Sequence, residues 1–318
     1  MNHLHDMVDL ECYHSGEALR LAARSKNTQV AYEKGWQCFV AWSRVVGLVP
    51  HEATSEDIVR FLVAMATKGR GGKPLALNTL RLYRSALNDR WRRMGSMSPA
   101  SAQIVGEVLQ GIARLRGDTP RRVKALREYQ VLAMLKKCEN GLHGIRDAAV
   151  LSLGFAAALR RSELCNLRTE DLERKVGEGL MIHLRKSKTD QQGTGQQVAV
   201  IEGNSIKPVE QLERWLQASC IREGFVFQTL LRGGVVSGRP LDSGEVARVV
   251  KRHAKRIGLN PREYSGHSLR AGFVTSAAVH RARIDKIMEV TRHRSAETVL
   301  KYVRDEESFS DHAGATFL

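Results

Sequence analysis

The sequence predicts a mainly α-helical protein of two domains, with a small β-hairpin or sheet in the second domain. Its 318 residues are enough for two domains, and 42% of them are hydrophobic, which is enough to build real cores. Apolar residues recur at helical spacing along most of the chain, whereas residues 177–202 contain stretches in which apolar and polar residues alternate. The sequence contains no internal repeat and no low-complexity segment.

The first domain, residues 1–117, is predicted to be a compact bundle of four helices with basic faces. Gly47, Gly69 and Gly117 are typical helix stop signals, and Thr54 or Ser55 is a plausible N-cap. The four helices are expected at residues 28–47, 54–69, 75–95 and 99–117. The third helix carries Arg81, Arg84, Arg90, Arg92 and Arg93.

Residues 118–127 are predicted to form a basic linker between the domains, because they show no apolar periodicity and contain Pro120. Two interpretations are open. The segment is either a solvated connection or a strap that lies along a phosphate backbone. Its basic residues are Arg121, Arg122, Lys124 and Arg127.

The second domain, residues 128–318, is predicted to begin with helices, to continue with a hairpin and to return to helix. Helical patterns cover residues 128–138 and 144–159. Two strands at residues 177–189 and 196–202 flank a turn, which indicates a hairpin. The chain is expected to be helical again from Ser243 onward.

The formal net charge of +16 predicts a polyanionic partner. An anionic membrane is the competing polyanion, but the longest apolar run, Leu151–Leu159, is far too short to span a bilayer. The N-terminus does not resemble a signal peptide, and the five cysteines lack zinc-ligand spacing. We therefore expect an intracellular, cytoplasmic protein that needs no metal and no membrane.

A histidine and an arginine open one of the later predicted helices. His267 and Arg270 are three residues apart, so both project from one side of its first turn. The start of a helix already favours an anion, because its backbone N–H groups and its dipole are positive there. This pair therefore predicts a site that holds a negative group.

Four further residues are candidates for chemistry, although each also has an ordinary interpretation. Arg160 follows an apolar helix, and it could simply form a helix-terminal ion pair with Glu163. Lys188 at the hairpin tip could simply be solvated. His293 and Tyr302, the latter late on a helix that starts near Ser295, could belong to the core.

Together these residue types form a set that can break and rejoin a phosphodiester without a metal or another cofactor. Two arginines can bind the non-bridging oxygens and stabilise a five-coordinate phosphorus. A tyrosine can attack the phosphorus while a histidine takes its proton, and a lysine can protonate the departing oxygen.

The chain resembles the tyrosine site-specific recombinases of the phage integrase family, in the style of Cre and Xer, over almost its whole length. The segments "SGHSLRAGF" and "H…KYVRD" carry the resemblance most clearly. The resemblance implies a two-domain DNA clamp, in which a helical core-binding bundle is followed by an α+β catalytic domain. It also implies a role for each residue of the set: Arg160, Lys188, His267, Arg270 and His293 as catalytic groups, Tyr302 as the nucleophile and Glu163 as a support for Arg160.

Two positions depart from the common pattern of the family. Many relatives have Gly-Leu-Arg where this chain has Ala158 before Leu159 and Arg160, and Gly-His where it has Arg292 before His293. We expect the alanine to be accommodated in a helix. The sequence does not indicate whether Arg292 contacts DNA or solvent.

The resemblance implies site-specific recombination through a 3′-phosphotyrosine and a four-way junction, without ATP. It further implies a homotetramer on two double-stranded DNA sites with inverted-repeat cores. In such an assembly residues 307–318 either pack into a neighbouring protomer or fray. Base contacts are expected from the third and fourth helices, and phosphate contacts from the linker. A type IB topoisomerase, a telomere resolvase and a non-catalytic DNA-binding regulator remain as alternatives.

Overall fold

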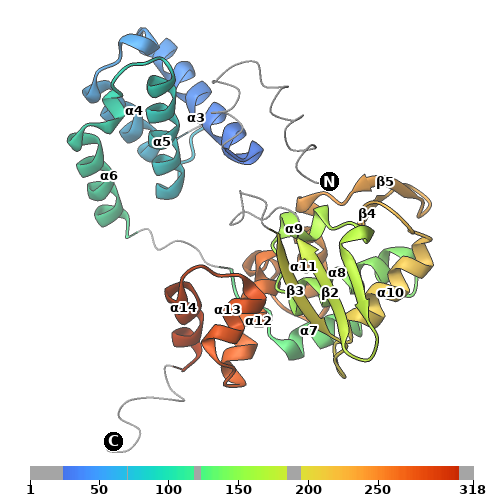
Figure 1. The fold of residues 1–318 in the computed structure, drawn as a ribbon. Coiled ribbons are helices and arrows are strands. Elements are labelled where there is room, and N and C mark those ends of the chain that lie inside the picture. Colours follow the sequence, from blue (N-terminus) through green and yellow to red (C-terminus); the bar gives the residue numbers. More distant parts are fainter. Residues whose placement is uncertain (1–23, 70, 118–122, 185–194, 308–318) are drawn as a thin grey trace, which may run out of the picture. The chain divides into compact units, whose positions relative to one another are not determined.

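The computed structural model describes residues 24–69, 71–117, 123–184 and 195–307, except for the side chains of Lys301 and residues 303–307. The chain forms two compact units, Met1–Arg121 and Arg122–Leu318 (Figure 1). The described part is mainly helical, with two small antiparallel sheets in the second unit. This confirms the predicted fold class.

The first unit is a helical bundle. Its fully buried core includes Phe39, Phe61, Leu80 and Leu87, and the rings of Phe39 and Phe61 meet edge to face with 5.1 Å between their centroids. The bundle consists of α3 (Lys26–Val45), α4 (Ser55–Thr67), α5 (Leu77–Arg93) and α6 (Gln103–Arg116), with short 3-10 helices at Pro50–Glu52 and Pro99–Ser101.

The ends of these helices follow from local residues. Thr54 caps α4, because its hydroxyl accepts from the backbone N–H of Asp57 while the Asp57 carboxylate accepts from the N–H of Thr54. Gly117 ends α6 in the left-handed conformation, with φ 56°. The fourth helix starts four residues later than the sequence predicts, because Pro99 begins a separate 3-10 turn.

The second unit contains eight described α-helices and a three-stranded sheet in the order β1-β2-β3. The helices are α7 (Glu128–Leu135), α8 (Leu142–Ala156), α9 (Arg161–Asn166), α10 (Pro208–Ser219), α11 (Ser243–Arg256), α12 (His267–Val279), α13 (Ile284–Thr291) and α14 (Ala296–Glu307), with 3-10 turns at Thr169–Asp171 and Pro261–Glu263. The strands are β1 (Leu172–Lys175), β2 (Gly179–Leu184), β3 (Gln196–Ile201), β4 (Gln228–Leu230) and β5 (Val236–Pro240).

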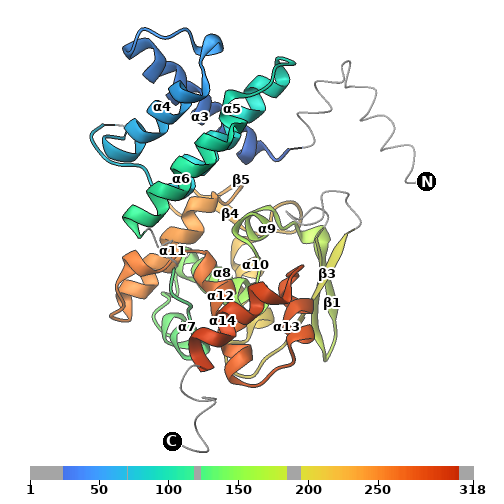
Figure 2. The ribbon, with the colours of Figure 1, turned by 90° about the vertical axis from the view of Figure 1, so that its left-hand side faces the viewer.

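One face of the three-stranded sheet packs on the helices. Strands β2 and β3 are antiparallel, with Leu180 opposite Val200. Val198 and Val200 are buried while Ala199 between them is exposed, which is the alternation of a half-buried strand. Figure 2 shows the helices of this unit on one side of the sheet. The predicted pair of strands is present, but the sequence did not predict β1, β4 or β5.

The last part of the predicted linker is packed against the start of α12. The backbone N–H of Lys124 donates to the carbonyl of Glu263 (2.9 Å), and that of Leu126 donates to the carbonyl of Ser268 (3.0 Å). Leu126 is fully buried, and a Cβ atom at Gly272 would lie 1.7 Å from its carbonyl oxygen. Gly272 therefore allows this close approach.

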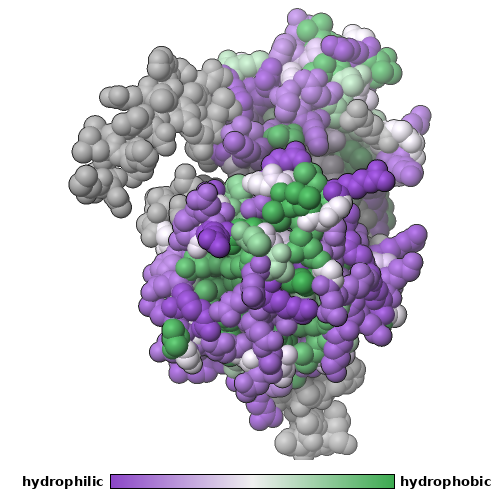
Figure 3. All heavy atoms as spheres, turned by 90° about the vertical axis from the view of Figure 1, so that its right-hand side faces the viewer, coloured by the Kyte–Doolittle hydropathy of each residue, from purple (hydrophilic) through white to green (hydrophobic). Residues whose placement is uncertain are grey.

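Hydrophilic side chains cover most of the face seen in Figure 3, and apolar side chains form smaller patches between them. Within the described residues, no helix has the length and hydropathy needed to cross a membrane.

Candidate active site

Helix α12 presents His267 and Arg270 on its first turn, as the sequence predicts. Arg270 is only 2% exposed, and its Nη1 donates to the carbonyl of Ala158 at 2.7 Å. Its buried Nη2 has no acceptor among the described residues. A buried donor without an acceptor raises the free energy of the folded protein. An anion that accepted from Nη2 would remove this cost and form a strong, charge-assisted hydrogen bond.

Arg160 lies directly before α9 and is held by Glu163. The backbone N–H of Arg160 donates to Oε2 of Glu163 (2.8 Å), and its Nη1 donates to Oε1 (2.5 Å). Burial raises the pKa of Glu163, but the charge of Arg292 and the bonds from Arg160 outweigh it and lower the pKa below its ordinary value. Glu163 is therefore an anion that orients Arg160, which is the supporting geometry that the resemblance implies.

Tyr302, on α14, lies next to His267, with 3.1 Å between its hydroxyl oxygen and Nε2. Part of His267 is exposed, but burial of its ring, with Arg270, Arg161 and Arg160 nearby, lowers its pKa below 6.5. A neutral imidazole at this distance can accept the phenol proton of Tyr302. Among the described contacts, the Tyr302 hydroxyl meets His267 and not His293.

His293 is fixed by the fully buried Thr291. The Thr291 hydroxyl donates to the carbonyl of Ile287 (2.6 Å), so its oxygen accepts from Nδ1 of His293 (2.8 Å). Burial, with Arg270 and Arg160 nearby, lowers the pKa of His293 to about 4. Its Nε2 is then the nitrogen that remains for a substrate.

Positive charge predominates in this cluster. Three arginines, Arg160, Arg270 and Arg292, surround the single carboxylate of Glu163. Burial and the charges of Arg160 and Arg292 lower the pKa of Arg270 to about 9, so it keeps its charge at neutral pH. An anion bound here would relieve the repulsion between the arginines. Lys188, the remaining predicted catalytic residue, lies outside the described residues.

The expectation for Ala158 is wrong. The residue does not lie inside a helix but follows the end of α8 in the left-handed conformation, with φ 46°. This conformation is unfavourable for a residue with a Cβ atom. It belongs to the turn in which the Ala158 carbonyl accepts from Arg270.

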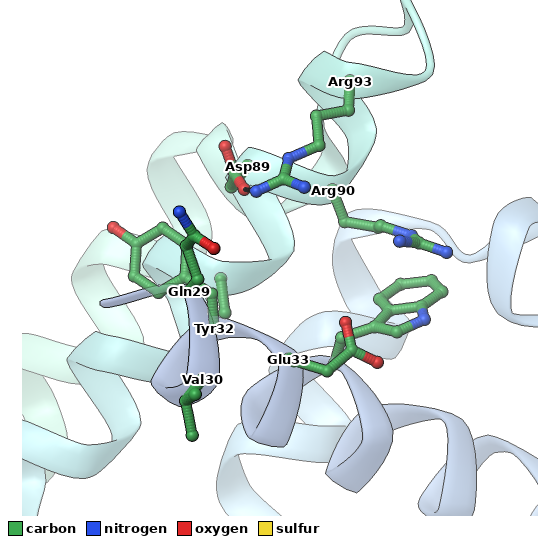
Figure 4. Close-up of a pocket in the computed structure, with 9 residues that line it drawn as sticks. Gln29, Val30, Tyr32, Glu33, Asp89, Arg90 and Arg93 are labelled. Carbon is green, nitrogen blue, oxygen red and sulfur yellow. Dashed lines mark ion pairs between the residues drawn. The ribbon is translucent and has the colours of Figure 1, made fainter. Parts of the chain in front are cut away.

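Some arginines of α5 have partners within the protein, whereas others are exposed to solvent. Figure 4 shows Arg90 and Arg93 beside a groove of about 300 Å³ in the first unit, where Arg93 pairs with Asp89 (2.8 Å). The Arg90 guanidinium lies 5.0 Å from the centroid of the Trp36 ring. These two side chains are thus engaged in the bundle itself.

Among the other expected DNA contacts, Arg84 donates to the carbonyl of Ala100 (2.9 Å), and Lys124 pairs with Glu263 (3.0 Å). Two of the arginines of α5 are exposed to solvent, Arg81 and Arg92. Arg121 and Arg122 lie outside the described residues.

The match to a known family settles what kind of protein this is. Residues 124–308 match the profile of the phage integrase family, which is more than half of the chain. The chain belongs to the phage integrase family. It is therefore a tyrosine recombinase, an enzyme that cleaves and rejoins DNA strands.

Two relatives and two solved structures agree with this. The recombinase is 32% identical to an integrase/recombinase xerD homolog of Selenomonas ruminantium (92% of this chain, 85% of the relative) and 24% identical to recombinase cre of Escherichia phage P1 (85% and 81%). It shares its fold with XerH site-specific recombinase bound to palindromic difH substrate (TM-score 0.60, 16% identity, 84% of this chain and 73% of that chain). It also shares its fold with a lambda integrase dimer bound to a COC′ core site (TM-score 0.57, 18% identity, 96% of each chain).

Two features of the recombinase site were not assigned from the sequence. Thr291 was not singled out, because a threonine late in a helix has no distinctive local signal. Arg292 was noticed only as a departure from the family pattern, and the structure buries it against Glu163.

Proposed function

We propose that Tyr302 is the nucleophile of a site-specific recombination reaction and that His267 is its general base. The observation that carries this proposal is the 3.1 Å contact between the Tyr302 hydroxyl and His267 Nε2, two groups that interact electrostatically with Arg270, whose Nη2 is unpaired. The oxygen of Tyr302 attacks the phosphorus as its proton passes to His267. The P–O5′ bond then breaks, which leaves a 3′-phosphotyrosine and a 5′ oxygen.

In this proposal His293 is neutral and adds no charge at the phosphate, whose non-bridging oxygens are bound by Arg160 and Arg270. Their charges stabilise the extra negative charge of the five-coordinate phosphorus. Lys188 protonates the departing 5′ oxygen. A 5′-hydroxyl of a partner duplex reverses the steps, so the phosphotyrosine link conserves the bond energy and no ATP is consumed.

The partner is double-stranded DNA with inverted-repeat core sites, on which four copies assemble through a four-way junction. Residues 1–117 form the core-binding domain, residues 118–127 the basic linker and residues 128–318 the catalytic domain with its tail for oligomerisation. The solved structures of XerH bound to palindromic difH substrate and of a lambda integrase dimer bound to a COC′ core site support this partner class. The exposed Arg81 and Arg92 are the best candidates on α5 for DNA contact, because Arg84, Arg90 and Arg93 already have partners within the protein.

The test uses a library of randomised duplexes that carry a nick near the cleavage point, so that the short 5′-hydroxyl fragment is lost and the adduct is trapped. Wild type should form adducts that survive denaturant, and the trapped DNA should converge on one inverted-repeat sequence. Tyr302→Phe should form none. The matched control is Tyr129→Phe, which changes an exposed tyrosine on α7 and should react like wild type.

Each other outcome contradicts part of the proposal. Adducts without sequence convergence would indicate a topoisomerase, and a product with hairpin ends would indicate a telomere resolvase. Specific DNA binding without any adduct would indicate a regulator that has lost its catalytic activity.

A further inference from the structure

Arg292 has an unusual backbone and an unusual environment. It follows α13 in the left-handed conformation, with φ 58° and ψ 40°, and its N–H donates to the carbonyl of Met288 at 2.7 Å. Its side chain is only 4% exposed. Both features cost free energy for an arginine, since the left-handed region favours glycine and a buried cation must be compensated. Contacts of the guanidinium must therefore outweigh these costs.

The guanidinium joins three segments of the second unit. Nη2 donates to Oε2 of Glu163 (2.8 Å), on α9, and Nη1 donates to the carbonyl of Val290 (2.8 Å), on α13. Longer contacts of 3.4 Å reach the carbonyls of Ala157 and Ala158, at the end of α8. One side chain thus ties the ends of α8 and α13 to the start of α9.

Two of these acceptors also hold an arginine of the active site. Oε2 of Glu163 accepts from the backbone N–H of Arg160, and Oε1 accepts from its guanidinium. The carbonyl of Ala158 accepts from Nη1 of Arg270. Arg292 therefore shares one acceptor with Arg160 and another with Arg270.

We propose that Arg292 is a positioning residue, which holds Glu163 and the Ala158 carbonyl so that Arg160 and Arg270 present their remaining donors to the scissile phosphate. In this proposal Arg292 acts through its inward-facing Nη1 and Nη2 and not on the phosphate itself, because its side chain is only 4% exposed, although its buried Nε has no acceptor among the described residues. The inference rests on the proposed function, because it deepens the roles given there to Arg160 and Arg270.

Burial lowers the pKa of Arg292, and Glu163 opposes that change. The two groups therefore stabilise each other as an ion pair. Without Arg292, Glu163 would lose one of the two arginines whose guanidinium groups bond to its carboxylate, and the turn at Ala158 would lose a link to α13. The expected defect is in the placement of charges around the phosphate and not in the affinity for the DNA duplex.

The experiment compares three single variants of the full chain in single-turnover adduct formation on a nicked duplex, at saturating DNA. Arg292→Gly removes the side chain but suits the left-handed backbone. Arg292→Lys keeps a cation but loses the planar fork that serves several acceptors. The matched control is Arg281→Gly, which removes an exposed arginine that has the same left-handed conformation, with φ 55°.

Arg292→Gly should slow adduct formation at least tenfold, while its DNA dissociation constant stays within about twofold of wild type. Arg292→Lys should fall between Arg292→Gly and wild type in rate and should unfold below the wild-type temperature, because a buried ammonium serves fewer of these acceptors. Arg281→Gly should react at the wild-type rate. A wild-type rate in Arg292→Gly, or a wild-type rate in Arg292→Lys when Arg292→Gly does not fold, would overturn the proposal.

A double variant separates positioning from a general loss of stability. If Arg292 acts through Glu163, then Glu163→Gln combined with Arg292→Gly should be no more than about threefold slower than the slower single variant. If the rate loss of the double variant equals the product of the losses of the two single variants, the inference is overturned. The proposed function fails separately, when Tyr302→Phe still forms the adduct.

Discussion

The rate of strand cleavage should depend on pH in a way that the active site already specifies. The pKa of His267 lies below 6.5 because of the burial of its ring and the nearby arginines, and a base must be neutral to take the Tyr302 proton. As pH falls below this pKa, the neutral fraction drops about tenfold per pH unit, and the cleavage rate should drop with it. Arg270 contributes no alkaline limb, because a guanidinium beside the bound phosphate keeps its proton. We therefore expect an acid limb below pH 6.5 and a plateau above it.

The assay measures single-turnover adduct formation on the nicked duplex, with the enzyme in excess so that all of the DNA is bound. It covers pH 4.5 to 10 in buffers of constant ionic strength. His267→Asn serves as the control, because it removes the titrating base and should abolish the acid limb while lowering the plateau. His293, with a pKa of about 4, can contribute only at the most acidic end. An acid limb centred above pH 6.5, or one that persists in His267→Asn, would refute the assignment of the base.

Three further predictions concern single side chains. Tyr302→Phe should unfold within about 2 °C of wild type, since it removes only one hydrogen bond from a partly exposed residue, and thermal unfolding checks this. Thr291→Val leaves Nδ1 of His293 without its acceptor, so it should cost about 1–2 kcal/mol in urea unfolding and also slow cleavage; an unchanged rate would contradict the role of Thr291. Asp147→Asn should cost about 3 kcal/mol in urea unfolding, because the buried carboxylate pairs with Arg252 (2.7 Å) and contacts His253 (2.9 Å), and a loss below about 1 kcal/mol would show that these contacts are unimportant.

The sequence predicted those features that depend on neighbours in the chain. The apolar spacing of α3 to α6 and of α8 is a local signal, and so are the cap at Thr54 and the stop at Gly117. The spacing of His267 and Arg270 placed both on the first turn of α12 for the same reason. Helix geometry alone brings residues three apart to one side.

The remaining features depend on contacts between distant segments, which no local pattern encodes. His267 and Tyr302 are 35 residues apart, and Arg292 and Glu163 are 129 apart. The left-handed conformation of Ala158 depends on the turn that supports Arg270. Because that support comes from a distant segment, the sequence alone does not distinguish this turn from a helix. The short strands β1, β4 and β5 form only because partners exist for them.

The net charge of the site matches the transition state more closely than the substrate. Among the described residues, Arg160, Arg270 and Arg292 carry three positive charges and Glu163 carries one negative charge, so two positive charges remain. A phosphodiester has one negative charge, whereas the five-coordinate phosphorus formed by an attacking phenolate has two. Catalysis requires interactions that strengthen as the reaction proceeds. Glu163 thus has two effects: it orients Arg160, and its negative charge compensates one of the three arginines.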